Sequence, residues 1–317
     1  FRYLPNGCVL GDAGPVCFTD KEYFFLGLLN SKVIQTILPI INPTINCSTG
    51  IVNLLPVAGI DNLKVDTLSK DNVTISRHDW DAHETSWDFK TNELVLLAKA
   101  NQTIDEIVRE YKAVWTENFM QLHSNEEELN RQFIEIYGLQ DELTPDVPLN
   151  EVTILQKGEI SIEEDEIVWH DDVIIKQLIS YLIGCFMGRY SIDRPGLIIA
   201  SQHQDLNALG LKVEGIDNGA KGRIAIDDDG IMPILEGEYF AEDMTVRIEQ
   251  AIKVLFGEAR LQENLKYINE KLGKTLREYL FKDFFADHID GKMYQKRPIY
   301  WLFSSKMGVK EKKGYFK

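Results

Sequence analysis

Four potential metal ligands lie close together in the stretch from Asp79 to Glu84. Asp79, Asp81, His83 and Glu84 could supply carboxylate and imidazole ligands to a divalent cation that activates water for hydrolysis. Such a site needs ligands that converge on one point and outer groups that hold them, and a dense local run seldom provides both. The favoured interpretation is an ordered loop, anchored by the aromatic side chains of the same stretch: Trp80, Trp87 and Phe89.

A row of short polar side chains lies in the passage INPTINCSTGIVNLLPV, residues 41–57. Asn42, Thr44, Asn46 and Ser48 fall at alternate positions, so in an extended strand they would share one face. Amide and hydroxyl groups in such a row can contact base edges or phosphates of DNA. A solvated or turn-forming face is the other interpretation of the same pattern.

Three further motifs lack the spacing that their chemistry requires. The segment Gly219–Gly222 lacks the spacing of a phosphate-binding loop, and Asp227–Gly230 lacks the distal glutamate of a calcium loop. The cysteines form neither CxxC pairs nor a zinc-site spacing, which predicts reduced thiols: Cys8, Cys17, Cys47 and Cys185.

Charge is distributed unevenly along the 317 residues. The chain carries a net charge of -16, which argues against a general polyanion binder because affinity for nucleic acid depends on Lys and Arg. From Ile289 to Lys317, however, eight Lys and Arg face two acidic residues, giving about +6 and leaving about -22 for the remainder. The segment KRPIYWLFSS, Lys296–Ser305, combines basic residues with aromatic residues and suits contact with a nucleic-acid backbone. An edge strand whose aromatics face the core remains an equal alternative.

The apolar periodicity predicts an α+β fold that is predominantly helical, with small mixed sheets. The stretch Val173–Gly188 is apolar on nearly every side and predicts a central core helix, shorter than the ~20 apolar residues of a membrane span. The capping boxes Thr103-x-x-Glu106 and Ser124-x-x-Glu127 predict two successive helices. Further helices are expected at these ranges: Glu22–Leu38, ended by Pro39, then Ala241–Phe256, Ala259–Leu272 and Leu276–His288.

Short β-prone segments and turns separate these helices. Strands are expected at Val73–Ile75, near Val152–Ile154, at Leu197–Ala200, at Arg223–Ile226 and within Lys296–Ser305, and no long helix is expected between residues 59 and 102. The acidic run Glu163–Glu166 predicts solvated surface. The chain starts at Phe1 and shows neither a signal peptide nor a membrane span, so we expect a cytoplasmic fragment of a longer polypeptide.

Seven separated passages together resemble one protein family. They are YFFLGLLNSKV, INPTINCSTGIVNLLPV, DWDAHETSWDF, EEELNRQFIEIYGLQDELTP, ISYLIGCFMGRYSID, LQENLKYI and KRPIYWLFSS. In this order they resemble the C-terminal half of the large single-chain adenine-N6 DNA methyltransferases. That family includes the PglX proteins of BREX phage-defence systems and type II restriction enzymes that carry their own methylase. The resemblance covers nearly all of the chain.

The resemblance implies a methyltransferase polypeptide whose catalytic domain is absent from this chain. In the family, an S-adenosylmethionine domain with an N-P-P-Y motif lies N-terminal to the passages quoted above, and its aromatic residue stacks on the flipped adenine. The nearest match here, Asn42-Pro43-Thr44-Ile45, lacks the second proline and the aromatic. We therefore expect no methyl transfer and no cofactor binding by this chain, whereas the full-length protein would use S-adenosylmethionine.

The resemblance also implies three functional regions along the chain. Residues 1–58 would be the C-terminal part of a target-recognition domain, 59–102 a linker of ordered loops, and 103–317 a helix-rich C-terminal domain with a basic terminal segment. Double-stranded DNA would be the partner; an alternative is a protein-interaction platform that docks other defence-system subunits. The candidate DNA contacts are Lys296, Arg297, Lys306, Lys310, Lys312, Lys313, Arg189, Tyr190, Arg194, Asn42, Thr44 and Asn46.

Overall fold

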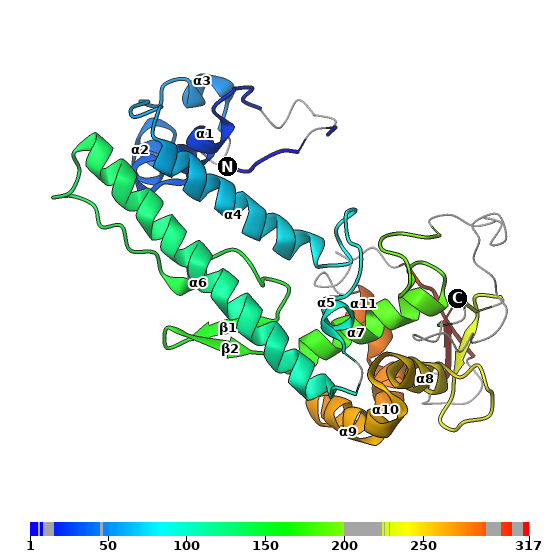
Figure 1. Cartoon of the computed structure of the whole chain (residues 1–317). Coiled ribbons are helices and arrows are strands. Elements are labelled where there is room, and N and C mark those ends of the chain that lie inside the picture. The colour runs from blue at the N-terminus through cyan, green and yellow to red at the C-terminus, as the bar shows by residue number, and fades with distance from the viewer. Residues whose placement is uncertain are drawn as a thin grey trace. The chain divides into compact units, whose positions relative to one another are not determined.

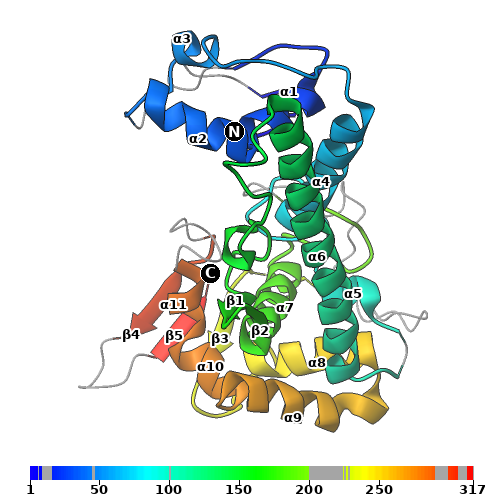
Figure 2. The same cartoon turned by 90° about the vertical axis from the view of Figure 1, so that its left-hand side faces the viewer.

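The computed structural model describes residues 1–5, 7–8, 16–44, 47–99, 101–199, 224, 226–227, 229–289, 299–305 and 313–316. The described residues form mainly helices with two small sheets, which confirms the predicted fold class (Figure 1, Figure 2). The chain folds into two compact units, each discontinuous in sequence. Unit 1 comprises Phe1–His78, Thr116–Ile154 and Glu164–Glu166, and unit 2 comprises Asp79–Trp115, Leu155–Glu163 and Ile167–Lys317. The proposed functional division at residues 58 and 102 stays a prediction.

Unit 1 is built from helices around an aromatic and aliphatic core. Its elements are α1 (Glu22–Asn30), α2 (Lys32–Ile41), α3 (Thr49–Val52), most of α4 (Leu63–Asp81), the C-terminal part of α6 (Ile104–Tyr137) and η1 (Leu149–Glu151). Phe24 of α1, Val65 of α4 and Phe133 of α6 are completely buried in this core. The rings of Phe24 and Phe133 meet edge to face with centroids 5.7 Å apart.

The single helix predicted for Glu22–Leu38 is two helices. Ser31 between them has an extended backbone (φ -69°, ψ 155°), and its hydroxyl donates to the carbonyl of Leu28 at 2.7 Å. The two helices are bent by 69° at this break. Pro39 does not end α2, which continues to Ile41. Among the described residues, no single helix has the length and apolar character needed to cross a bilayer. Within the same residues, the bent pair α1–α2 meets both criteria only when its two helices are counted as one.

The strand predicted at Val73–Ile75 is wrong, because these residues lie inside the 19-residue helix α4. Asn62 begins the helix: its Oδ1 accepts hydrogen bonds from the backbone N–H of Lys64 at 3.0 Å and of Val65 at 3.3 Å. The β-branched residues favour a strand locally, but burial of one helical face against the unit 1 core overrides that preference. The prediction that residues 59–102 contain no long helix is therefore also wrong.

Helix α6 is one continuous helix of 34 residues instead of the two predicted. The first capping box is confirmed, since the N–H of Thr103 donates to Glu106 Oε2 and the N–H of Glu106 donates to Thr103 Oγ1. The second box does not form. Glu127 instead accepts a hydrogen bond from the N–H of Val147 at 3.2 Å, and no Gly or Pro interrupts the helix at this point.

Unit 2 surrounds the predicted central helix, α7 (Asp171–Phe186), which has eleven buried residues and contacts α8 and α9. The other elements of unit 2 are α5 (Glu93–Leu97), the N-terminal part of α6, β1 (Ile160–Glu163), β2 (Glu166–Trp169, whose first residue is assigned to unit 1), β3 (Met232–Ile234), α8 (Met244–Phe256), η2 (Glu258–Arg260), α9 (Leu261–Leu272), α10 (Leu276–Lys282), α11 (Phe284–Ile289), β4 (Leu302–Ser305) and β5 (Lys313–Phe316).

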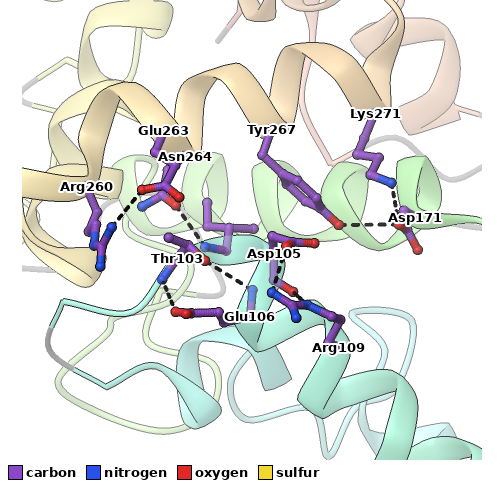
Figure 3. A network of polar contacts seen from close by, with 11 residues as sticks. Thr103, Asp105, Glu106, Arg109, Asp171, Arg260, Glu263, Asn264, Tyr267 and Lys271 are labelled. Carbon is purple, nitrogen blue, oxygen red and sulfur yellow. Dashed lines mark hydrogen bonds and ion pairs between the residues drawn. The ribbon is translucent and has the colours of Figure 1, made fainter.

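A polar network joins α6, α7 and α9 in unit 2 (Figure 3). Asn264 of α9 accepts a hydrogen bond from the N–H of Ile104 at the start of α6, at 2.8 Å. Asp171, the first residue of α7, forms ion pairs with Lys112 of α6 at 2.9 Å and with Lys271 of α9 at 2.8 Å. Burial opposes ionisation of Asp171, but these two ammonium groups lower the pKa of its carboxyl group. The network fixes the N-terminus of the central helix.

The strands differ in part from those predicted. Residues 152–154 are not a strand, and the hairpin β1–β2 lies further along the chain. Its turn, Glu164-Asp165, has positive φ angles of 51° and 62° and is exposed, as expected of the solvated acidic run. Residues 197–199 are not a strand, and of the predicted strand Arg223–Ile226, residues 223 and 225 lie outside the described residues while 224 and 226 are not in a strand. The C-terminal prediction is confirmed for β4, which pairs antiparallel with β5, and β5 pairs antiparallel with β3.

Candidate nucleic-acid interface

The C-terminal basic segment enters the described structure as the β4–β5 pair. Lys313 lies in β5 opposite Ser305 of β4. On and just before β4, Trp301 and Phe303 are exposed at 65% and 55%. The aromatic residues of this segment are therefore divided, since Tyr300 is buried whereas Trp301 and Phe303 face solvent, and contact with a nucleic-acid backbone stays a prediction. The other predicted basic contacts lie outside the described residues: Lys296, Arg297, Lys306, Lys310 and Lys312.

His288 at the end of α11 anchors this segment. Its Nε2 accepts hydrogen bonds from the backbone N–H of Ile299 at 2.9 Å and of Tyr300 at 3.3 Å. The imidazole stacks on the ring of Tyr300 with centroids 4.8 Å apart, and both side chains are buried. Burial, with a smaller effect of the nearby Arg189, lowers the pKa of His288 to about 4. The neutral ring therefore acts as a hydrogen-bond acceptor that fixes where the strand begins.

The predicted contacts after the central helix lie against the same anchor. Gly184 of α7 packs so closely that an added Cβ would lie 2.6 Å from the Tyr190 ring and 3.2 Å from the Tyr300 hydroxyl. Tyr190 is only 3% exposed and stacks on Tyr181 at 5.5 Å. Arg189 donates from Nε to the Tyr190 hydroxyl at 3.0 Å. The structure thus brings residues 189–190 beside the origin of β4, with the tyrosine ring in the core.

Arg194 is exposed on the turn that follows. The turn is held at its far side, where the N–H of Gly196 donates to the carbonyl of Lys90 at 2.8 Å. Among Arg189, Tyr190 and Arg194, only the two arginines have solvent-accessible side chains. Their contact with DNA stays a prediction.

The predicted polar row of unit 1 forms a turn, and its described residues are not in a strand. The side chain of Asn42 donates from Nδ2 to the carbonyl of Thr44 at 3.2 Å, and the Thr44 hydroxyl donates back to Asn42 Oδ1 at 2.7 Å. Ser48 precedes the short helix α3, and Asn46 lies outside the described residues. Asn42 and Thr44 therefore do not form part of an extended face, because their side-chain hydrogen bonds favour the turn.

The potential metal ligands near residue 80 have structural roles. His83 Nε2 lies 2.6 Å from Glu159 Oε1, and His83 Nδ1 lies 2.6 Å from the carbonyl oxygen of Asp79. Among the residues that the structure describes, no three His, Cys, Asp or Glu side chains converge as a metal ion would need. No sequence pattern indicated a role for Glu159, which lies 76 positions from its partner.

The tryptophans expected to anchor this loop do not do so. Trp87 is completely exposed and Trp80 is 49% exposed, with the ammonium of Lys157 5.8 Å from its ring centroid. Phe89, by contrast, is buried as predicted and meets the ring of Tyr190 edge to face at 5.1 Å. The His83–Glu159 pair replaces the tryptophans as the principal anchor.

The His83–Glu159 pair is buried, and each partner favours the charged form of the other. Burial opposes protonation of His83, but the Glu159 carboxylate raises the pKa of the imidazole above its ordinary value. Burial likewise opposes ionisation of Glu159, but hydrogen bonds from His83 and from Gln177 Nε2, at 2.6 Å, lower its pKa. Since both imidazole nitrogens face oxygen acceptors, the imidazolium form satisfies both contacts.

A cavity of about 200 Å³ adjoins this pair in unit 2. Within its lining, Lys176 forms ion pairs with Asp172 at 3.1 Å and with Asp287 at 3.5 Å. Both imidazole nitrogens of His83 are already bound, so this ring has no lone pair to offer a substrate. The arrangement therefore resembles an ion-paired polar interior more than a catalytic centre. The full lining is Ala82, His83, Glu84, Phe89, Asn92, Lys157, Asp172, Val173, Lys176, Gln177 and Asp287.

Two known proteins are similar to almost the whole chain. "Adenine-specific methyltransferase BrxX" of Escherichia coli O9:H4 (strain HS) is 34% identical over 325 residues, and "Adenine-specific methyltransferase PglX" of Lacticaseibacillus casei (strain Zhang) is 36% identical over 320 residues. Each match covers 96% of this chain. The chain spans about a quarter of the length of these relatives, 26% and 24% respectively. No protein-family model matches the chain.

Proposed function

Because this chain is homologous to a segment of the adenine-specific methyltransferases, as its seven passages predicted, we propose that it is the DNA-recognition and DNA-clamping part of such an enzyme. The enzyme would serve a phage-defence or restriction-modification system and act on double-stranded DNA. Methyl transfer from S-adenosylmethionine would belong to another part of the polypeptide. The similarity over 96% of the chain is the observation that carries this proposal.

The anchored C-terminal segment supports a clamping role. Eight Lys and Arg between residues 289 and 317 give this segment a net positive charge that can bind phosphates, whereas the rest of the chain is net negative. The buried contact of His288 with Ile299 and Tyr300 ties this segment to the helical body. A basic segment that starts from a rigid anchor loses less conformational entropy on binding than a free tail would.

Charge reversal in this segment tests the proposal. We expect the double variant Lys296→Glu/Arg297→Glu to weaken duplex binding by at least about tenfold at moderate salt, because two phosphate contacts become repulsive. Fluorescence anisotropy with a labelled duplex, measured across a salt series, gives the affinity and its salt dependence. The parent chain should show salt-sensitive binding and no methyl transfer from labelled S-adenosylmethionine.

A matched control is available in unit 2. Lys253 and Lys266 are exposed and lie on α8 and α9, so Lys253→Glu/Lys266→Glu imposes the same change of charge at other sites. If both double variants bind DNA as well as the parent chain, the basic segment is not the clamp.

A protein-interaction platform is the second candidate, and the acidic body favours it. Outside residues 289–317 the chain carries about -22, which suits a partner with a basic face. Pull-down of the other subunits of the system at low and at high salt separates the candidates. Salt-sensitive capture of a subunit, together with no measurable duplex binding, would favour the platform.

A further inference from the structure

Helix α4 presents a continuous polar face to solvent in unit 1. Between the exposed Leu63 and Trp80, its exposed residues are polar and recur every three or four positions, which places them on one side of the helix. From residue 64 to residue 77 this face extends for about 20 Å, at 1.5 Å per residue. The opposite side carries the buried Val65 and Ser69. We define the α4 face as Lys64, Thr67, Lys70, Asp71, Thr74, Arg77 and His78.

The charge of the α4 face contrasts with that of its neighbour in the same unit. The face holds three permanent cations and, among the described residues of this face, one carboxylate, that of Asp71. The unit 1 part of α6, residues 116–137, holds five glutamates and one arginine. The two helices lie side by side, since Asn125 Nδ2 donates to Asn72 Oδ1 at 2.8 Å and Lys64 pairs with Glu128. Within an acidic chain, positive charge is thus collected on one helix face, complementary to a polyanion.

Short side chains between the cations allow close approach to that face. The hydroxyl of Thr67 donates to the carbonyl of Leu63 at 2.9 Å, and that of Thr74 donates to the carbonyl of Lys70 at 3.0 Å. Both side chains therefore fold back along the helix, with their hydroxyl hydrogens already used. A helix with side chains is 10–12 Å across and the major groove of DNA is about 12 Å wide. The α4 face has the dimensions of a groove-binding surface.

An aromatic stack holds the cation at the end of the face. The guanidinium of Arg77 lies 5.6 Å from the ring centroid of Tyr3, and Tyr3 stacks on Tyr23 with centroids 5.9 Å apart and planes within 2°. A guanidinium that rests on a ring loses less side-chain entropy when it binds phosphate, and its planar fork suits bidentate recognition.

From these observations we infer that the α4 face is a duplex-DNA contact surface, with Lys70 and Arg77 on the phosphates and the two threonines toward the groove. This inference rests on the proposed function and adds a contact element that the sequence pattern did not indicate. The duplex is favoured over a protein partner because the cations alternate with short hydroxyl side chains and lack an apolar centre of the kind that protein interfaces bury.

Two opposite changes of charge test the inference in the full chain. Lys70→Ala/Arg77→Ala should weaken duplex binding about tenfold and lower the magnitude of the salt slope by roughly 2, about one for each phosphate that is no longer neutralised. Asp71→Lys should act in the other direction, with an affinity gain of several fold and a slope steeper by about 1. The gain is diagnostic, since a misfolded variant does not bind more tightly. Binding to a labelled duplex is measured by anisotropy from low to moderate salt.

Controls separate this inference from the proposed function. Lys253→Ala/Lys266→Ala removes two exposed cations elsewhere and should leave the affinity within twofold. If the parent chain does not bind duplex DNA at all, the proposed function fails, and this inference with it. If the parent binds and Lys296→Glu/Arg297→Glu weakens binding, but neither α4 variant changes affinity or slope, only the inference about α4 is overturned. If the α4 variants instead fail to capture another subunit while duplex binding is unchanged, the inference is also overturned.

Discussion

His83 and His288 are both buried in unit 2, yet their surroundings favour opposite charge states. The ring of His83 faces two acceptors, the carbonyl of Asp79 and the carboxylate of Glu159, each at 2.6 Å. The Nε2 of His288 instead faces two backbone donors, the N–H groups of Ile299 and Tyr300. Acceptors stabilise an imidazolium and donors stabilise the neutral ring. Burial opposes protonation of both rings: at His83 the acceptors outweigh it, whereas at His288 the two backbone donors favour the same neutral form that burial favours.

The two histidines also fasten different segments of unit 2. The charged pair of His83 ties the loop after α4 to Glu159, and Gln177 of α7 binds the same carboxylate. The neutral His288 ties the proposed DNA clamp to α11. The two histidines should therefore contribute to the free energy of unfolding with opposite dependence on pH. Each contribution can be removed separately by substitution.

Removal of Glu159 should have the largest effect. Glu159→Ala removes the completely buried carboxylate that pairs with His83, and loss of one partner of a buried pair costs about 3–5 kcal/mol. Urea unfolding at pH 6, followed by circular dichroism, measures the change in free energy of unfolding.

A matched acid provides the control for that measurement. Glu163 is exposed at the end of β1 and lies only four positions from Glu159, so Glu163→Ala should change stability little. Equal effects of the two variants would show that the His83–Glu159 pair does not hold the loop.

Much of the helical fold could be predicted from local signals, and the errors have a common physical origin. The central helix was evident because α7 is apolar on nearly every side. The Thr103–Glu106 box was evident because its partners are three residues apart. α4 was missed because Val73 and Ile75 dominate its local pattern, although Asn62 carries the N-cap signal and Val65 with Ser69 has helical spacing.

The anchors of the candidate site could not be found from spacing alone. His83 was singled out, but its partner Glu159 is 76 positions away and comes close only through tertiary packing. His288 was placed in the last predicted helix, yet nothing in the sequence indicated that its ring would accept the N–H of Ile299. The basic and aromatic character of the C-terminal segment was visible as composition, because composition does not depend on the fold.

Acidification should destabilise the His288 anchor by the next largest amount. The ring titrates near 6.5 when unfolded and at about 4 when folded, so the unfolded chain binds more protons between these values. The contribution of His288 is fully present above pH 6.5 and decreases by about 3 kcal/mol as the pH falls through 4.

Comparison with the variant His288→Gln isolates the pH-dependent contribution of His288 to stability. The difference in unfolding free energy between the parent chain and the variant should decrease steadily from pH 7 to pH 4.5, since glutamine keeps an acceptor but does not titrate. A difference that is constant with pH would mean that His288 is not a neutral acceptor in the folded protein.

His83 should show the opposite sign with a smaller amplitude, because burial opposes what Glu159 favours. Its folded pKa is raised above 6.5, so its contribution is fully present below pH 6.5 and is lost as the pH rises through the folded pKa.

Glu159 has a lowered folded pKa, so its own contribution is lost only as the pH falls below 4.5 and through that lowered value. The difference in unfolding free energy between the parent chain and His83→Gln should therefore be largest between about pH 4.5 and 6.5 and decline toward pH 8.5. If the contribution of His83 instead grows toward alkaline pH, as that of His288 should, burial sets the charge of His83, and the role assigned here to its two acceptors is wrong.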